Sequence, residues 1–180
     1  MKAARHVLRY LKGTKYYSIV YGDVQSSAYA TALRSKVQII GYADADWGSD
    51  KDDRKSTTGY IFIINRGAVS WTSHKQTSNA VSTMEAEYMA LSDASREAIA
   101  RIQLYSDLTI YTPSPLLFSD SQSALALTGD PTNYSRSKHI DIRYHFIRDV
   151  IQKNQISVDY IPSTDQPADI LTKALGPLPH

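Results

Sequence analysis

Residues 37–46 read VQIIGYADAD, a run of β-forming residues that ends in two aspartates. The run predicts a strand over Val37–Asp46. Side chains alternate along a strand, so Asp44 and Asp46 share one of its faces. Spacing alone therefore does not separate the two carboxylates as candidates for a functional site.

Further β-forming runs follow this strand. They predict strands at Gly59–Asn65, Ala68–His74, Leu116–Phe118 and Ile156–Ile161. The tripeptide Asn65-Arg66-Gly67 predicts a hairpin turn, with Gly67 available for a positive φ.

Apolar residues at helical spacing lie between and after these strands. The longest such stretch, Ser82–Leu108, carries an apolar residue at almost every third or fourth position. Shorter helices are predicted at Ser121–Leu127, His139–Lys153 and Pro167–Leu175. This order predicts an α/β chain with a five-stranded mixed sheet, in which a three-stranded meander precedes parallel crossover units. Polar chemistry then collects at the carboxyl ends of the parallel strands.

The composition excludes several classes of protein. The chain has 180 residues and no Cys, which removes disulfides, zinc knuckles and thiol catalysis. Its net charge of +2 is too small to coat nucleic acid by bulk charge. No apolar run approaches the roughly 20 residues that span a bilayer, and the N-terminus does not resemble a signal peptide, so no membrane partner is expected.

The N-terminal region has a separate pattern. An amphipathic helix is predicted over Lys2–Lys12, followed by a strand at Tyr16–Tyr21. The polar stretch Asp23–Lys36 is typical of a linker. We therefore expect an N-terminal helix–strand extension over residues 1–36 and a main domain over residues 37–180.

Four acidic residues occupy the ends of predicted strands or the apolar side of a helix: Asp44, Glu87, Asp120 and Asp169. Converging carboxylates would repel one another, and two divalent ions would balance four negative charges. Oxygen ligands suit Mg²⁺ or Mn²⁺, and a pair of such ions can cleave a phosphodiester. The alternative is that each acid is a helix cap or a solvated end.

Two glutamates compete for the position on the long helix. On a helical wheel Glu87 lies about 55° from the centre of the packed face, and Glu85 lies about 105° away, towards solvent. The wheel therefore favours Glu87 as the residue that reaches the sheet.

Several motifs resemble the ribonuclease H domain of copia-type LTR retrotransposon Pol polyproteins. The motifs are GYADADW (41–47), STTGY (56–60), Ser70-Trp71, STMEAEYMAL (82–91), KHIDIRYHF (138–146) and PADILTK (167–173). RHVLRYLKGT (5–14) resembles the end of the reverse transcriptase that precedes that domain. The resemblance runs from about Val37 to Leu175, with the motifs in the family's order.

The resemblance implies a ribonuclease H-like fold and endonucleolytic hydrolysis of the RNA strand of RNA–DNA hybrids during reverse transcription. It implies two Mg²⁺ ions, for which Mn²⁺ could substitute, held by Asp44, Glu87, Asp120 and Asp169 as catalytic residues. Only the resemblance selects Asp44 over Asp46. The expected partners are the hybrid and the polymerase domain of the same polyprotein, in intracellular, cytoplasmic virus-like particles. The alternative is an inactive or domesticated module that binds nucleic acid or a polymerase.

Other residues are candidates for contact with the substrate. Ser121 and Gln122 follow Asp120 in the family's Asp-Ser-Gln pattern. Arg136, Lys138, His139 and Arg143 form a basic stretch that could bind phosphates, or a solvated helix face with an Asp141–His145 pair. The loop Ser163–Gln166 lacks the mobile His of cellular ribonucleases H, which bears on turnover. We also expect Trp47 and Trp71 in the core.

Overall fold

Five strands form one mixed sheet in the computed structural model of the chain, which describes residues 2–22, 38–108, 110, 113–129 and 138–174, without the side chains of 138–141. The strands are β1 (Ile40–Asp46), β2 (Thr57–Ile64), β3 (Gly67–Lys75), β4 (Leu116–Ser119) and β5 (Ser157–Tyr160). Their order across the sheet is β3-β2-β1-β4-β5. Antiparallel pairing joins β1, β2 and β3, whereas β4 is parallel to β1 and β5 is parallel to β4. The predicted meander and parallel crossovers are confirmed.

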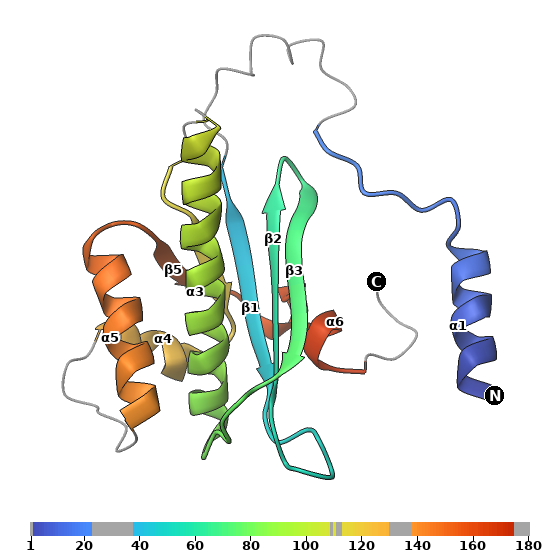
Figure 1. The fold of residues 1–180 in the computed structure, drawn as a ribbon, viewed down its shortest axis with the longest axis horizontal. Helices are drawn as coiled ribbons and strands as arrows, with labels where there is room; N and C mark the ends of the chain where they lie inside the picture. The colour runs from blue at the N-terminus through green and yellow to red at the C-terminus, as the bar shows by residue number, and fades with distance from the viewer. Residues whose placement is uncertain (1, 23–37, 109, 111–112, 130–137, 175–180) are drawn as a thin grey trace.

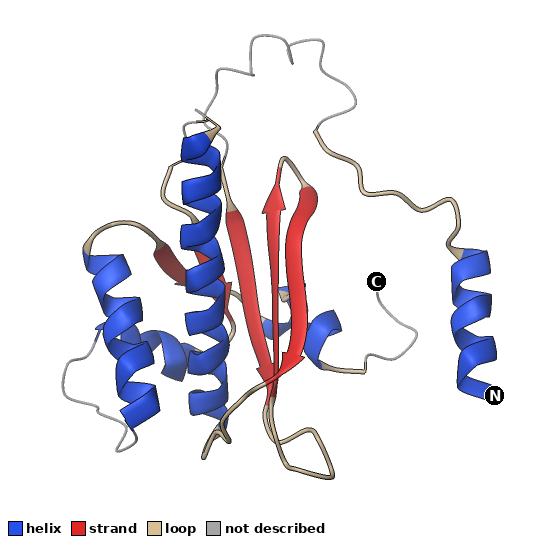
Figure 2. Ribbon diagram, in the orientation of Figure 1, coloured by secondary structure: helices blue, strands red, loops and turns tan. Residues whose placement is uncertain are grey.

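The helices lie on both faces of this sheet (Figures 1 and 2). The described helical segments are α1 (Lys2–Gly13), α3 (Thr83–Asp107), α4 (Gln122–Gly129), α5 (Lys138–Gln152), η1 (Ser163–Asp165) and α6 (Asp169–Thr172). The long helix α3 packs across β1 and β2 and contacts both α4 and α5. The short helix α6 contacts β1, β2 and β3. In Figure 1 α1 stands apart from the sheet, and none of its residues is buried.

Alternation along β1 divides the core from the polar site. Ala43 belongs to the buried apolar cluster with Tyr88 and Leu91 of α3. The next side chain, Asp44, points to the other face, where Thr172 donates a hydrogen bond to it. Because β1 and β4 are parallel, their carboxyl ends meet at one edge of the sheet, which brings Asp44 near Asp120.

The start of α3 is fixed by a capping arrangement. Ser82 is the N-cap, and its side chain accepts a hydrogen bond from the backbone N–H of Glu85 at 3.1 Å. The Glu85 carboxylate in turn accepts from the backbone N–H of Val81 at 2.8 Å. Glu85 is therefore buried, and the expectation that it points towards solvent is wrong. Its side chain folds back onto the N–H of Val81, the residue before the N-cap.

In the turn of the β2–β3 hairpin, positive φ angles occur at other residues than the predicted Gly67. The two residues with positive φ are Asn65 (48°) and Arg66 (69°), which form the two-residue turn. Gly67 is not among the glycines with positive φ. A Cβ there would lie 2.3 Å from a ring carbon of Tyr21, so the glycine permits close approach of that ring. The hairpin is thus confirmed, but the reason given for its glycine is wrong.

Other local predictions differ from the structure. Tyr16–Tyr21 is not a strand. Two isolated bonds attach its end to the hairpin, from Tyr21 Oη to the carbonyl of Ala68 and from the N–H of the next residue, Gly22, to the carbonyl of Asn65, both 2.7 Å. The expected linker and domain boundary lie outside the described residues. The helix predicted at Pro167–Leu175 is shorter, since α6 ends at Thr172.

The two tryptophans are exposed, so their expected place in the core is wrong. Trp71 is 57% exposed on the outer strand of the meander, and Trp47 is 48% exposed just after β1. The Trp47 indole N–H donates to the carbonyl of Ala80, which accounts for its position on the surface. Within the described residues, no helix is long and apolar enough to cross a bilayer.

A substitution at Gly41 tests the packing between β1 and its neighbours. A Cβ there would lie 2.4 Å from Leu117 Cδ2 and 2.6 Å from Phe62 Cε1, both in the buried core. Gly41→Ala is therefore expected to lower the free energy of unfolding by about 1–3 kcal/mol, as overpacked cores do. Gly129→Ala, where a Cβ meets nothing within 4 Å, is the control for urea denaturation. Equal stabilities of the two variants would contradict this packing.

Candidate metal and active site

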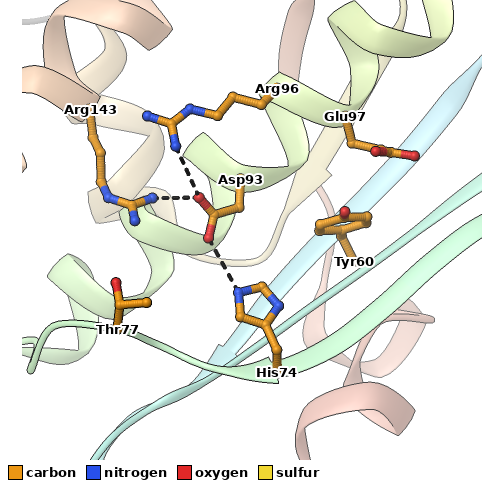
Figure 3. Close-up of a pocket in the computed structure, with 7 residues that line it drawn as sticks. All are labelled: Tyr60, His74, Thr77, Asp93, Arg96, Glu97 and Arg143. Atoms are coloured by element: carbon orange, nitrogen blue, oxygen red, sulfur yellow. Dashed lines mark hydrogen bonds and ion pairs between the residues drawn. The ribbon is translucent and has the colours of Figure 1, made fainter.

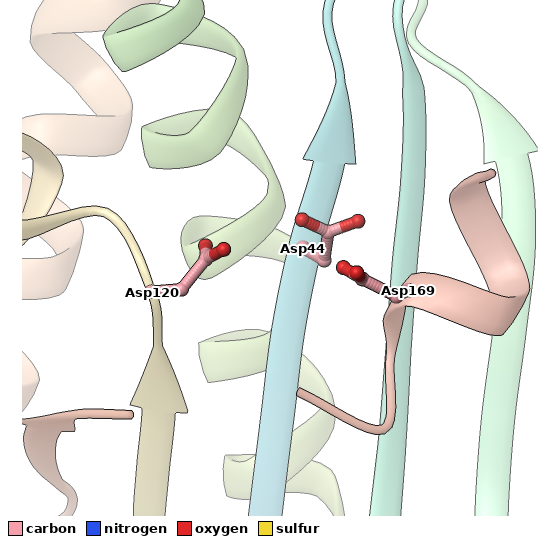
Figure 4. Close-up of side chains that lie close together, drawn as sticks. All are labelled: Asp44, Asp120 and Asp169. Carbon is pink, nitrogen blue, oxygen red and sulfur yellow. The ribbon is translucent and has the colours of Figure 1, made fainter. Parts of the chain in front are cut away.

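Three aspartates converge at one edge of the sheet (Figure 4). Asp44 lies on β1, Asp120 directly follows β4, and Asp169 begins α6. One carboxylate oxygen from each residue lies within 4.8 Å of the others. Asp46 is not part of this group, although it lies on the same face of β1. Segments far apart in the sequence thus build one cluster of oxygen ligands.

Glu87 approaches the cluster from the first turns of α3. It is buried, and its Oε2 atom has no hydrogen-bond partner. Burial, together with the charges of Asp44 and Asp120, raises the pKa of Glu87 to about 9, against smaller opposing effects of the Lys173 charge and the Ala45 backbone N–H. A buried carboxylate oxygen without a donor, next to two other carboxylates, is a position that favours a cation.

Asp44 is the most enclosed of the four acids. It is fully buried, and Thr172 donates a hydrogen bond to one of its oxygens. The Lys173 ammonium lies 3.2 Å from its other oxygen and 2.7 Å from Asp169. Burial raises the pKa of Asp44, while the bond from Thr172 and the charge of Lys173 act in the opposite direction. Burial opposes the charged form of Lys173, but its bonds to Asp169 and Asp44 raise the pKa of the ammonium overall.

These contacts show that the residues fit a divalent cation. The Lys173 ammonium already occupies a position between Asp44 and Asp169, so the cluster accepts positive charge there. Carboxylate oxygens without thiolate or imidazole ligands suit hard cations such as Mg²⁺ and Mn²⁺. The four acids carry more negative charge than one ammonium balances, and a divalent ion would relieve their repulsion.

The loop before the last acid also contacts the cluster. Ser163, at the start of η1, donates a hydrogen bond of 2.5 Å to Asp120. This serine lies in the loop Ser163–Gln166, which departs from the resembled family pattern because it has no His. The loop therefore reaches the site through a hydroxyl.

The residues predicted to contact the substrate have different surroundings in the structure. Ser121 caps α4, since its hydroxyl accepts from the Ala124 N–H at 3.2 Å, and Gln122 is exposed beside it. Arg143 is largely enclosed and donates to Asp93 at 2.6 Å. Arg136 lies outside the described residues, as do the side chains of Lys138 and His139. A phosphate contact of Arg143 would have to compete with Asp93.

Arg143 lines a cavity of about 500 Å³ beside α3 (Figure 3). The lining of this cavity does not include the clustered aspartates. Asp93 lies at its centre and is approached by Arg143, by His74 at 3.6 Å and by Arg96 at 3.8 Å. These groups come from α3, α5 and β3. The cavity is thus lined by charges that already have partners within the protein, and its geometry indicates a structural connection between these elements.

Two residues next to the acids were missed as members of the site. Thr172 and Lys173 belong to the motif that resembles the family, but no role followed from it. The spacing of Asp169 and Lys173 was a usable signal, because residues four apart on a helix lie on the same face. The contact of both residues with Asp44 joins positions 128 or more residues apart, which no local pattern reveals.

The chain has relatives among the Pol polyproteins of plant transposons. The sequence matches no protein-family model. It is 37% identical over 97% of its length to the retrovirus-related Pol polyprotein from transposon TNT 1-94 of Nicotiana tabacum. It is 36% identical over 98% of its length to that from transposon RE1 of Arabidopsis thaliana. The chain spans only 12% and 11% of these two relatives.

Solved structures agree with the fold. The ribonuclease H1 LC11, isolated from compost, matches 75% of this chain and 92% of its own, with a TM-score of 0.54 and 16% identity. The foamy viral protease–reverse transcriptase in complex with an RNA/DNA hybrid matches 76% of this chain and 20% of its own, with a TM-score of 0.52 and 16% identity. The chain therefore has the ribonuclease H-like fold. It is homologous to a segment of plant copia-type Pol polyproteins, which confirms the resemblance seen in the motifs.

Proposed function

We propose that the chain hydrolyses the RNA strand of RNA–DNA hybrids with two divalent ions, as the ribonuclease H segment of a retrotransposon Pol polyprotein. The observation that carries this proposal is the cluster of Asp44, Asp120 and Asp169, with Glu87 beside it, at the carboxyl ends of β1 and β4. The fold and the homologues support the same activity.

Each acid has a role that its place supports. Asp44 and Asp169, whose oxygens lie within 4.8 Å of each other, would hold the ions together with Glu87. Asp120 would complete the set, oriented by the hydroxyl of Ser163. Bound ions would activate a water and stabilise the leaving oxygen of the phosphodiester. Ser121, Gln122, Arg136, Lys138, His139 and Arg143 remain proposed contacts to the hybrid.

The polymerase region of the same polyprotein is the proposed protein partner. Leu8 and Leu11 of α1 are exposed together with Val7, so this helix presents an apolar face without a partner in the described chain. A domain boundary near Lys36 and a location in intracellular particles belong to the same proposal. The polyprotein relatives support the location.

Cleavage assays with three duplexes test the activity. A labelled RNA–DNA hybrid should be cut with Mg²⁺ or Mn²⁺, and duplex RNA and duplex DNA should not. EDTA should abolish cutting, and Ca²⁺ should support binding better than turnover because its looser coordination misplaces the water. The products are resolved by gel electrophoresis.

The same assays separate the proposal from its alternative. Cleavage that persists in EDTA would contradict a metal-dependent mechanism. Hybrid binding without cleavage under any metal would instead identify a binding module that has kept the fold.

A further inference from the structure

The loop before the last acid contains a buried amide, that of Gln166. Its side chain is 5% exposed and lies between the sheet and the start of α6. Nε2 donates to the carbonyl of Ala43 at 3.1 Å, and Oε1 accepts from the backbone N–H of Ala168 at 3.3 Å. Both ends of the amide are therefore satisfied by backbone groups.

The two backbone partners have a specific place in the chain. Ala43 directly precedes Asp44 on β1, and Ala168 directly precedes Asp169 at the start of α6. One side chain thus bonds to the peptide unit between Ala43 and Asp44 and to the N–H of Ala168, the residue before Asp169. Helix α6 has only four residues, and it also contacts β1, β2 and β3.

The other described hydrogen bonds from this region to β1 are of a different kind. They come from Thr172 and Lys173, and both end on the Asp44 carboxylate. A cation bound to Asp44 would compete with these two bonds. The bonds of Gln166 end on backbone groups, so they persist whether or not the carboxylates hold a cation.

We propose that Gln166 is a positioning residue that sets the separation of Asp44 and Asp169 for binding a divalent cation. The inference rests on the proposed function, since it assumes that these acids are metal ligands. Partners that orient metal ligands commonly change metal affinity when they are replaced. Gln166 is such a partner through the backbone.

Metal titration tests the inference. In Gln166→Met, which keeps the size of the side chain and removes both bonds, the affinity for Mn²⁺ measured by calorimetry is expected to fall by about tenfold. The Mg²⁺ concentration that gives half-maximal hybrid cleavage should rise by a similar factor, while KM for the hybrid stays unchanged. Saturating metal should restore cleavage, and circular dichroism without metal should show that the variant is already folded, because metal would also stabilise a partly unfolded variant.

The control is Ile147→Val, which loosens the core in α5 away from the acids. It should bind Mn²⁺ as the unmodified chain does. If circular dichroism shows that Gln166→Met does not fold, Gln166→Asn takes its place, because its shorter amide does not reach both backbone partners. Unchanged Mn²⁺ affinity in a folded Gln166 variant would overturn the inference alone. Failure of the unmodified chain to bind Mn²⁺ would overturn the proposed function, and this inference with it.

Discussion

Glu87→Gln is expected to lower hybrid cleavage by about a hundredfold or more while the fold persists. The amide keeps the shape of the side chain but removes the charge that would bind a cation. Oε2 of Glu87 has no hydrogen-bond partner, so no described hydrogen bond to that atom is lost. Cleavage of a labelled hybrid and circular dichroism measure the two properties separately.

Stability in EDTA gives this variant a second test. The pKa of Glu87 is raised from 4.5 to about 9, so the folded state holds the proton more tightly than the unfolded state. The resulting stabilisation is complete below pH 4.5 and is lost as the pH rises through about 9. In Glu87→Gln, whose amide does not titrate, this loss of stability between pH 4.5 and about 9 should be absent. Parallel pH profiles of the two proteins in urea denaturation would contradict the burial and charge described for Glu87.

Glu85→Gln is the matched control on the same helix turn. Glu85 accepts from the Val81 N–H, and a glutamine oxygen can accept the same bond, so the cap persists. Cleavage should stay within about twofold, and stability within about 1 kcal/mol. Loss of cleavage in Glu85→Gln with retention in Glu87→Gln would show that the assignment of the two glutamates is reversed.

The two glutamates also show how far periodicity predicts a site. A wheel built on the apolar positions of α3 correctly directs Glu87 to the sheet, because the helix is continuous there. It fails for Glu85, because at the start of the helix this side chain folds back and accepts a hydrogen bond from the Val81 N–H, just before the N-cap. The Ser-x-x-Glu spacing of Ser82 and Glu85 was a local signal for that cap.

Local sequence patterns did not predict several features that depend on tertiary structure. The meander and the parallel crossovers followed from the sequence of elements, since short connections and crossover rules restrict the topology. Which parts of the sheet a helix covers does not follow from β-propensity, and Trp71 is exposed although it lies on a predicted strand. The preference for Asp44 over Asp46 is consistent with contacts from Thr172 and Lys173, which approach β1 from the far end of the chain.

Gly59→Ala is expected to reduce both metal affinity and hybrid cleavage by about tenfold or more, because the residue lies opposite Asp44 in the β1–β2 pair. A Cβ at Gly59 would lie 2.6 Å from Thr172 Cγ2, 2.9 Å from Leu171 Cβ and 3.2 Å from the Ala168 carbonyl oxygen. These atoms belong to α6 and to its first cap, so the helix must move away from the sheet. Asp169, which begins that helix, would then move away from Asp44.

Gly41→Ala is the matched control, because it introduces a comparable clash on β1 with core side chains of Leu117 and Phe62. Both variants should lose about 1–3 kcal/mol in urea denaturation. At a temperature where both are folded, only Gly59→Ala should show weaker Mn²⁺ binding by calorimetry, since only its clash displaces a metal ligand. Equal loss of metal affinity in the two variants would mean that general loosening of the sheet controls the site. Normal affinity in Gly59→Ala would mean that α6 adjusts without moving Asp169.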